Sequence, residues 1–332
     1  MTSVIRPVSP QAIAEGVALL RAGQLVGFPT ETVYGLGADA SDPAAVARIF
    51  AAKGRPNDHP VIVHVAPGAD LSRWAARLSP DAELLIAAYW PGPLTLILPR
   101  AAGVPDAVTG GQDTVGLRCP SHPVAQQLLR AFGGGVAAPS ANRFGRVSPT
   151  TAQHVADEFG SALSLVIDGG PCEVGIESTI IDMSGSEPVL LRPGHISVES
   201  LSRTLDKPVL TREEVEARRA TPRVSGALAA HYAPRTALEL VAAKDIGHRV
   251  QTLMAAGLRV GVWSETQPVA DVSWIVAPTD PVAYAQDLYA TLRLLDAQGL
   301  DILLLEATPD NDAWSAVNDR LGRAVVGSGS TG

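Results

Sequence analysis

The chain has 332 residues, 46% of them hydrophobic, and a formal net charge of −8 at pH 7. This length and apolar content favour two globular domains, and the acidic balance argues against a chain-wide nucleic-acid surface. The two cysteines, Cys119 and Cys172, are too few for a disulfide framework, so we expect a reducing compartment, the cytoplasm. Residues 1–24 lack a signal-peptide pattern and no apolar run is long enough to span a bilayer, so no membrane association is expected.

The first part of the chain alternates helical and extended patterns. Apolar residues recur at helical spacing within 10–20, and a buried strand is predicted at 25–28, followed by a loop at 29–32. Asp42 and Pro43 suit the N-cap and first position of a helix that Lys53 and Gly54 end. Short apolar runs typical of strands follow at 61–65, 95–98, 115–117, 136–138, 163–167, 178–181 and 189–191. We therefore expect a mixed, twisted α/β sheet.

The composition changes after residue 197. Residues 198–235 include a charge-rich run at 211–219, and we interpret them as a linker. Strands predicted at 238–241, 259–263, 273–276 and 302–306 then alternate with helices near 245–256, 281–298 and 312–326. This alternation is typical of a small, Rossmann-like, doubly wound parallel sheet. The expected organisation is a catalytic domain at 1–197, the linker at 198–235, and a small domain at 236–332 that ends in a flexible tail at 327–332.

A first polar cluster spans residues 28–37, 53–56 and 59–64, which combine small hydroxyls, glycines, two cations and two imidazoles. The phosphate-binding patterns G-x-x-x-x-G-K-[ST] and G-x-G-x-x-G are missing from the first domain. Lys53 and Arg55 lie on a glycine-containing turn and could direct two cations toward a phosphate or carboxylate. A solvated helix end explains the same two residues equally well.

His59 and His64 are five positions apart, an odd step, so a strand would place them on opposite faces. A metal site shared by the two is therefore not expected, and each alone is more often a structural histidine than a ligand contact. The spacing of Glu31, Asp168 and Asp182 does not indicate a carboxylate pair, and no covalent nucleophile is indicated.

Two further polar clusters follow buried runs. Ser140 and Asn142 come after the run at 136–138, and residues 177–182 place hydroxyls at the start of a strand. Such groups either satisfy turn amides or hold a ribose or phosphate oxygen. Arg192 lies at a strand end, where arginine is commonly a surface residue.

Six segments in order resemble the YrdC-type domain of threonylcarbamoyl-AMP synthases. They are 29–36 (Pro-Thr-Glu-Thr-Val-Tyr-Gly-Leu), 53–56 (Lys-Gly-Arg-Pro), 90–95 (Trp-Pro-Gly-Pro-Leu-Thr), 115–120 (Val-Gly-Leu-Arg-Cys-Pro), 139–142 (Pro-Ser-Ala-Asn) and 178–180 (Ser-Thr-Ile). Residues 225–234 and the small domain resemble the long, two-domain form of this family. The family linker usually reads Pro-Gly-Met-Lys-Tyr-Arg before His-Tyr-x-Pro, whereas alanines and a leucine replace its cationic positions here.

The resemblance implies a nucleotidyltransferase that makes threonylcarbamoyl-AMP and pyrophosphate from L-threonine, bicarbonate or carbon dioxide, and ATP, for threonylcarbamoyl modification of tRNA adenosine. The carbamate of threonine is the nucleophile in this chemistry, so the protein supplies positioning and charge neutralisation. The resemblance also implies Mg²⁺ bound through ATP oxygens and water, with no metal ligand from a protein side chain and no organic cofactor. A downstream tRNA threonylcarbamoyl-transferase complex is the implied partner, with weak tRNA binding as a further expectation.

Position by position, the resemblance implies three sets of site residues. Threonine is expected at Thr32, His64, Arg118, the backbone of Ala138, and Ser178, with Arg118 holding the carboxylate. ATP is expected at Arg55, His59, Thr114, Ser140, Ser148, Arg192, His231 and Tyr232, the last two reaching back from the linker. The catalytic set is Lys53 and Arg55, which would neutralise phosphate and carbamate charge.

Two other functions fit parts of the pattern. The same domain type is similar to part of enzymes that make carbamoyl-adenylate from carbamoyl phosphate, but those chains normally add zinc-finger cysteines or a large kinase-like domain. A non-catalytic module for tRNA or double-stranded RNA would bind with strong salt dependence, and the acidic balance and missing aromatic stacking motifs count against it. For the small domain we hypothesise a lid or an allosteric adaptor that acts through the linker.

Overall fold

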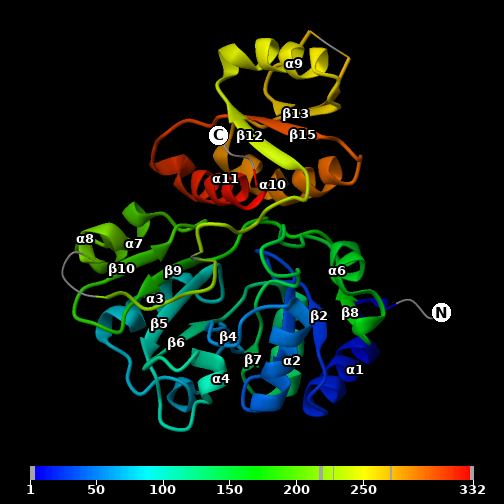
Figure 1. The fold of residues 1–332 in the computed structure, drawn as a ribbon. Helices are drawn as coiled ribbons and strands as arrows, with labels where there is room; N and C mark the ends of the chain where they lie inside the picture. The colour runs from blue at the N-terminus through cyan, green and yellow to red at the C-terminus, as the bar shows by residue number, and fades with distance from the viewer. Residues whose placement is uncertain (1–3, 217–219, 227, 270, 330–332) are drawn as a thin grey trace. The chain divides into compact units, whose positions relative to one another are not determined.

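The computed structural model describes residues 4–216, 220–226, 228–269 and 271–329, and the chain packs as two units (Figure 1). The first unit comprises residues 1–144 and 149–227, and the second comprises 145–148 and 228–332. The units thus divide inside the segment that we expected to be a linker. Residues 217–219 of its charge-rich run, and residues 330–332 of the expected tail, lie outside the described residues.

An eleven-stranded mixed sheet forms the frame of the first unit, in the order β1-β8-β2-β3-β7-β4-β6-β5-β9-β10-β11. Strand β4 pairs in parallel with β6 and antiparallel with β7, so the expected mixed α/β sheet is confirmed. The strands are β1 (Ile5–Pro7), β2 (Val26–Phe28), β3 (Gly35–Asp39), β4 (Val63–His64), β5 (Leu94–Pro99), β6 (Thr114–Arg118), β7 (Val136–Ala137), β8 (Val166–Asp168), β9 (Thr179–Asp182), β10 (Val189–Arg192) and β11 (Leu210–Thr211).

The helices of the first unit begin where short polar side chains and prolines predict. Ser9 and Asp42 cap α1 (Pro10–Arg21) and α2 (Pro43–Lys53), and each helix has a proline in its first turn. Helix α2 ends at Gly54, whose φ of 65° is in the left-handed region that glycine adopts without strain. The remaining helices are α3 (Pro80–Tyr89), α4 (Asp106–Thr109), α5 (Pro123–Phe132), α6 (Ala152–Phe159), α7 (Val198–Leu205) and α8 (Arg212–Glu216), with 3-10 turns at Leu71–Arg73 and Gly160–Ala162.

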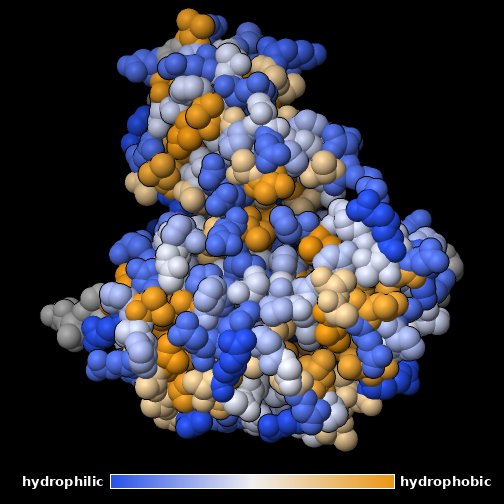
Figure 2. All heavy atoms as spheres, turned by 180° about the vertical axis from the view of Figure 1, so that it is seen from behind, coloured by the Kyte–Doolittle hydropathy of each residue, from blue (hydrophilic) through white to orange (hydrophobic). Residues whose placement is uncertain are grey.

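Apolar side chains fill both faces of the large sheet. Val26 and Phe28 of β2 pack in one cluster with α1 and α5, whereas Leu25 belongs to a larger cluster that includes Ile49 of α2 and Leu96 of β5. Neighbouring strand residues point to opposite faces, so this alternation places the two clusters on the two sides of the sheet. On the surface seen in Figure 2, exposed apolar residues lie among polar ones, which is ordinary for a protein surface.

Residues after 197 complete the edge of the first unit. Helix α7 packs against α3, and β11 pairs in parallel with β10. Val215 of α8 and Val224 join Ile180 and Leu191 in a small apolar cluster. The early part of the expected linker is therefore structurally integrated into the first unit.

The second unit contains a four-stranded sheet in which all neighbouring strands are parallel, in the order β12-β15-β13-β14. Helix α9 covers one face of this sheet, and α10 and α11 cover the other (Figure 1). Burial on both faces explains the continuous apolar run at 303–305, and the expected small doubly wound sheet is confirmed. Its elements are β12 (Ala237–Val241), α9 (Ile246–Ala255), β13 (Val260–Ser264), β14 (Ser273–Val276), α10 (Pro281–Asp296), β15 (Ile302–Glu306) and α11 (Ser315–Gly327), with 3-10 turns at Ala243–Asp245 and Asp312–Trp314.

Residues 145–148 join the second unit through backbone contacts. The amide of Ala233 donates to the carbonyl oxygen of Gly145, and the Arg293 side chain donates to the carbonyl oxygens of Val147 and Ser148.

In the part of the chain that the structure describes, no helix is both long and apolar enough to cross a membrane.

Candidate active site

The loop between β2 and β3 buries three consecutive polar residues. Thr30, Glu31 and Thr32 are 2%, 4% and 0% exposed. The Thr30 hydroxyl accepts from the amides of Thr32 and Val33 and donates to the Val33 carbonyl oxygen at 2.7 Å, which folds the loop back on itself. The side chains of Glu31 and Thr32 are thereby held inside the unit, where buried polar groups need partners.

Glu31 forms a buried ion pair with Arg118 at the end of β6. Oε1 of Glu31 lies 2.8 Å from Nη2 of Arg118, and both side chains are 5% exposed. Oε2 of Glu31 accepts from the amide of Ser121 at 3.1 Å, while Nε of Arg118 donates to the carbonyl oxygen of Gly92 at 3.3 Å. These contacts fix the direction of the guanidinium. The sequence analysis considered Glu31 only as a member of a carboxylate pair. Its position between two threonines in the most polar segment is the signal that could have indicated a role in the site.

His64 lies beside Arg118, because the two residues pair in register across strands β4 and β6. Burial, and secondarily the charge of Arg118, lowers the pKa of His64 to about 3, so the imidazole is neutral near pH 7. Its Nδ1 has no hydrogen-bond partner among the described residues. A neutral hydrogen-bonding group thus sits next to a buried cation.

Ser178, which the resemblance assigns to threonine, contacts Arg192, which the resemblance assigns to ATP. Its hydroxyl lies 2.7 Å from that of Thr95, and Nη2 of Arg192 donates to the same hydroxyl at 3.2 Å. Arg192 also donates from Nε and Nη2 to the Ser178 carbonyl oxygen, at 3.1 and 2.9 Å. Arg192 is only 3% exposed, so it is not a surface residue, although arginines at strand ends commonly are.

Ser225, from the expected linker, contacts two predicted nucleotide-binding arginines. Its carbonyl oxygen accepts from Nη1 of Arg192 at 2.9 Å, and its hydroxyl accepts from Nη2 of Arg55 at 3.4 Å. The same hydroxyl donates to the carbonyl oxygen of Pro60 at 3.0 Å, which also accepts from Nη2 of Arg55. Arg55, Ser225, Arg192 and Ser178 therefore form one connected series of contacts within the first unit.

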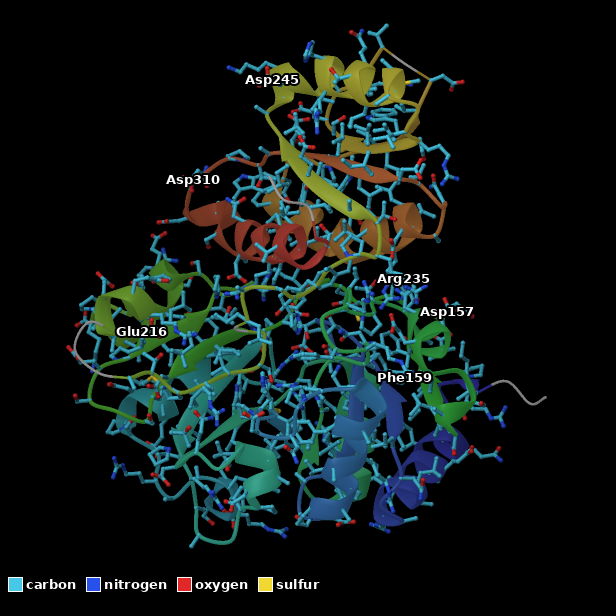
Figure 3. All side chains as sticks on the ribbon, viewed as in Figure 1. Asp157, Phe159, Glu216, Arg235, Asp245 and Asp310 are labelled. Carbon is cyan, nitrogen blue, oxygen red and sulfur yellow. The ribbon has the colours of Figure 1, made fainter. Side chains whose placement is uncertain are left out.

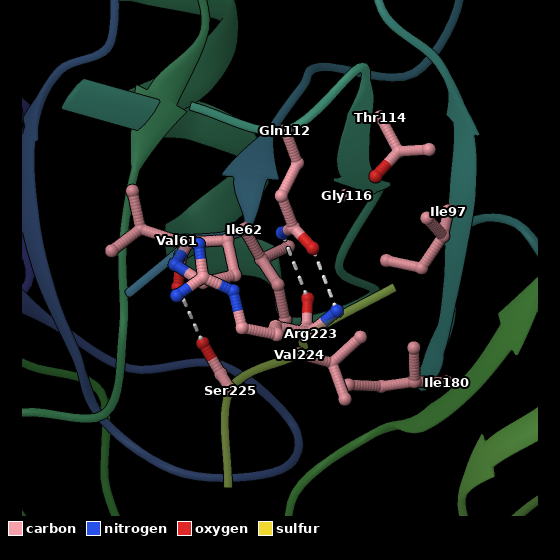
Figure 4. A pocket seen from close by; sticks show the side chains of 11 residues that line it. Val61, Ile62, Ile97, Gln112, Thr114, Gly116, Ile180, Arg223, Val224 and Ser225 are labelled. Atoms are coloured by element: carbon pink, nitrogen blue, oxygen red, sulfur yellow. Dashed lines mark hydrogen bonds between the residues drawn. The ribbon is translucent and has the colours of Figure 1, made fainter. Parts of the chain in front are cut away.

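Residues 223–225, around Ser225, cover the start of β6, where Thr114 lies (Figure 4). The Arg223 amide donates to the side-chain oxygen of Gln112 at 2.7 Å, and the Gln112 amide group donates back to the Arg223 carbonyl oxygen at 3.1 Å. A space of only about 10 Å³ remains in the pocket between these residues and Thr114. In this structure, residues 223–225 occupy the volume beside Thr114 and Arg55.

Lys53 is buried at the end of α2. Its side chain is 4% exposed and donates to the carbonyl oxygens of Ser140 and Asn142, each at 2.5 Å. Burial, and after it the charge of Arg55, lowers the pKa of Lys53 well below its ordinary value. The solvated helix end is therefore wrong for this residue, and the ammonium group holds the loop that carries Ser140.

The other predicted residues of the first unit occupy less connected positions. His59 is partly exposed, with its ring 5.9 Å from that of Phe144, and burial and the charge of Arg55 lower its pKa. Strand β4 is shorter than the expected run at 61–65, and His59 lies in the loop before it. Ala138, just past β7, donates its amide to the carbonyl oxygen of Ile62 at 3.0 Å.

Three of the predicted ATP-binding residues belong to the second unit. They are Ser148, His231 and Tyr232. The Tyr232 ring packs 4.1 Å from that of His231 and 5.7 Å from that of Tyr289, with the Arg320 guanidinium 5.4 Å from its centroid. Residue 227 of the divergent linker motif lies outside the described residues. The assignment of these three residues to ATP stays a prediction.

The two thiols of the chain are unsuited to nucleophilic chemistry. Cys119 and Cys172 are buried and unbridged. Burial, with the charge of Glu31 as the next cause, raises the pKa of Cys119 to about 11 and the pKa of Cys172 further. Both are therefore protonated near neutral pH.

What the first unit offers is buried cations, hydroxyls and a neutral imidazole, a set that can bind a small zwitterion and an anionic co-substrate.

Comparison with known proteins connects this site to one group. A family model described as "Telomere recombination", of the Sua5, YciO and YrdC proteins, matches residues 18–194, and a model of the threonylcarbamoyl-AMP synthase C-terminal domain matches residues 196–325. The chain is 39% identical to the threonylcarbamoyl-AMP synthase of Pyrococcus abyssi, over 92% of this chain and 91% of the relative. It is 37% identical to that of Bacillus subtilis, over 98% and 96%.

A solved structure extends the similarity to the fold. The crystal structure of P. abyssi Sua5 complexed with L-threonine superposes with a TM-score of 0.91 at 37% sequence identity, over 98% of both chains. Escherichia coli YciO matches with a TM-score of 0.52 at 25% identity, and it covers 60% of this chain and all of its own. Both units are thus represented in the P. abyssi relative.

Proposed function

The chain belongs to the Sua5, YciO and YrdC family, and from this premise we propose that it condenses L-threonine, bicarbonate or carbon dioxide, and ATP into threonylcarbamoyl-AMP. Curated relatives that span more than nine-tenths of both chains carry this activity in their names. The product feeds threonylcarbamoyl modification of tRNA adenosine. The enzyme is accordingly a transferase of the nucleotidyltransferase type.

One observation carries the proposal: Arg192 donates to both oxygens of Ser178, at 2.9 and 3.2 Å. Ser178 is a predicted threonine-binding residue and Arg192 a predicted ATP-binding residue. Their direct contact supports adjacent subsites, which the reaction requires because the threonine carbamate must reach the α-phosphorus of ATP.

For threonine, we propose that Arg118 binds the carboxylate. Its guanidinium is already oriented by Glu31 and by the Gly92 carbonyl oxygen. The neutral His64 and the hydroxyls of Thr32 and Ser178 would bind the amino and hydroxyl groups. The related P. abyssi protein was crystallised with L-threonine, which supports this choice of substrate.

The chemistry needs no nucleophile from the protein. The neutral amine of threonine adds to carbon dioxide and loses a proton, and a carbamate oxygen then attacks the α-phosphorus of ATP. The α-phosphorus bond to the bridging oxygen breaks, and pyrophosphate leaves. We propose that Arg55 and Arg192 neutralise the developing phosphate charge in a site from which water is excluded, where such contacts are strongest.

Mg²⁺ and the partners are part of the same proposal. Glu31 is engaged by Arg118 and Ser121, so it is not placed to bind a metal ion as well. As the family resemblance implies, Mg²⁺ would be bound by the oxygens of ATP and by water, and it would supply charge neutralisation to the phosphates. The product would pass to a tRNA threonylcarbamoyl-transferase complex.

The test is mass spectrometry of products from the purified full-length chain with ATP, L-threonine and ¹³C-bicarbonate. We expect threonylcarbamoyl-AMP with one ¹³C atom and one pyrophosphate per product. Carbamoyl phosphate should replace neither threonine nor bicarbonate, which separates the proposal from carbamoyl-adenylate synthesis. Arg118→Ala should lose saturation by threonine, while Arg73→Ala, at an exposed position, should behave as wild type. Pyrophosphate release that is independent of threonine would contradict the proposal.

A further inference from the structure

The second unit contains a pocket of about 370 Å³ at the carboxyl ends of β13, β14 and β15. Parallel strands bring their carboxyl ends to one edge of the sheet, the usual place for a ligand in doubly wound folds. The volume falls within the range of small-molecule sites, roughly 300–1,000 Å³. The described residues that line it include none of those assigned to threonine or ATP.

Tyr284 provides a buried polar atom that lacks a partner in this pocket. Its ring stacks on Trp263 at 4.1 Å and meets Trp314 edge-on at 5.4 Å, so its orientation is fixed. The side chain is 2% exposed, and its hydroxyl has no hydrogen-bond partner among the described residues. A buried hydroxyl without a hydrogen bond costs free energy in the empty pocket. A ligand that forms a hydrogen bond with it removes this cost.

The pocket is negatively charged. Glu265 and Glu306 both line it, and the Glu265 amide donates to Oε2 of Glu306 at 2.8 Å. The described lining residues include no lysine, arginine or histidine. Burial and the Glu306 carboxylate raise the pKa of Tyr284, so its hydroxyl stays protonated. This charge disfavours an anionic ligand, including a nucleotide.

The helix ends near the pocket do not reverse this charge. Asp280 caps α10 by accepting from the Ala283 amide, and Asn311 caps the next turn by accepting from the Ala313 amide. Both positive helix ends are thus satisfied by their own side chains. Figure 3 places a further carboxylate, Asp310, on the loop that follows β15. The described residues contain no cluster of three or more His, Cys, Asp or Glu side chains suited to a metal ion, which favours an organic ligand.

We propose that this pocket binds a small organic cation with a primary ammonium or guanidinium group. Glu306 and Glu265 neutralise its charge, and Trp314, which also lines the pocket, attracts it through a cation–π contact. The Tyr284 hydroxyl oxygen accepts a hydrogen bond from an N–H group of the ligand. The site is formed wholly by the second unit, and its occupation does not depend on the reaction proposed for the first unit.

Agmatine is the probe, because it carries an ammonium and a guanidinium group and no carboxylate. Calorimetric titration of the full-length chain should give saturable binding of one agmatine per chain. Glu306→Gln keeps an oxygen that can accept from the Glu265 amide but removes the charge, and it should weaken binding at least about tenfold. Glu239→Gln, whose carboxylate pairs with Arg249 at 2.8 Å instead, should bind agmatine as wild type does.

Tyr284→Phe separates a binding role from a structural one. The ring stacking stays and only the unpaired hydroxyl is lost, so the unfolding temperature should be unchanged or raised while agmatine binding weakens about threefold or more. A lowered unfolding temperature with unchanged binding would overturn the role of Tyr284 as a ligand contact. The proposal as a whole is overturned if neither agmatine nor putrescine binds saturably, or if glutarate or AMP binds in their place and Glu306→Gln strengthens it.

Discussion

Oε1 of Glu31 lies 2.8 Å from Nη2 of Arg118 in the interior of the first unit, with both side chains 5% exposed. Removing one charge of a buried pair leaves the other uncompensated, so the two residues act as one element. The pair points to Glu31 as a positioning residue for the guanidinium that we propose to bind the threonine carboxylate.

Glu31→Gln should therefore raise the KM for threonine more than it lowers kcat. Glutamine keeps an oxygen to accept from the Ser121 amide, but it no longer balances the Arg118 charge, so we expect an increase in KM of about tenfold, equivalent to about 1.4 kcal/mol. Steady-state kinetics at saturating ATP measure the effect. Glu173→Gln, at an exposed position, is the control. An equal fall in kcat with unchanged KM would contradict a positioning role.

The sequence predicted the sheet types well because hydrophobic periodicity records burial. The second unit follows this rule closely: the strands expected at 273–276 and 302–306 have those bounds. Strands β1, β3 and β11 were not predicted. Gly35 to Asp39 is rich in glycine and small residues, so no local pattern indicates a strand there. It is a strand because it pairs with its neighbour β2 and with the distant β7.

The candidate site was predicted as a set of residues, but its internal contacts were not. The Glu31–Arg118 pair and the contact of Arg192 with Ser178 join segments 87 and 14 residues apart, and only the register of the sheet brings them together. The two carbonyl oxygens that accept hydrogen bonds from Lys53 belong to the backbone, which carries no sequence signal. Likewise, the position of Ser225 beside Arg55 depends on tertiary packing.

Ser225→Ala should strengthen ATP binding. The Ser225 hydroxyl donates to the Pro60 carbonyl oxygen, which helps to hold residues 223–225 beside Arg55 and Thr114. Losing this neutral hydrogen bond costs about 0.5–1.5 kcal/mol, which corresponds to a roughly two- to tenfold lower Kd for ATP. Gln112→Ala removes a different attachment of the same segment and should act in the same direction. Both are measured by calorimetric titration with a non-hydrolysable ATP analogue. Weaker ATP binding by both variants would show that the segment stabilises the bound nucleotide instead.

His64 should make the stability of the first unit depend on pH. Its pKa is lowered to about 3 in the fold, against about 6.5 in the unfolded chain. Between these values the unfolded state binds one more proton, so stability is fully present above about pH 6.5 and falls by up to about 1.4 kcal/mol per pH unit as the pH decreases toward 3. Hydrogen exchange of β4 and β6 amides from pH 7 to 4.5, corrected for intrinsic exchange rates, reports this loss locally. His64→Gln should flatten the dependence, and an unchanged slope in that variant would assign it to other groups.

A chain that ends at residue 226 should be more stable than one that ends at residue 197. The shorter chain loses β11 from the edge of the sheet and loses Val215 and Val224 from their cluster with Ile180 and Leu191. Each buried valine contributes about 1.5–3 kcal/mol, so we expect the shorter chain to unfold at a markedly lower denaturant concentration.

The same comparison tests what residues 198–226 do for the site, because the shorter chain also lacks Ser225 and its bond to Arg192. Chemical denaturation followed by the fluorescence of Trp74 and Trp90 reports the first unit in both chains. If the chain to 226 keeps the stability of the full-length first unit but not its rate, the second unit contributes to catalysis rather than to folding, as a lid or adaptor would. Equal stability of the two truncated chains would mean that the edge formed by β11, α8 and Val224 is not part of the cooperative core.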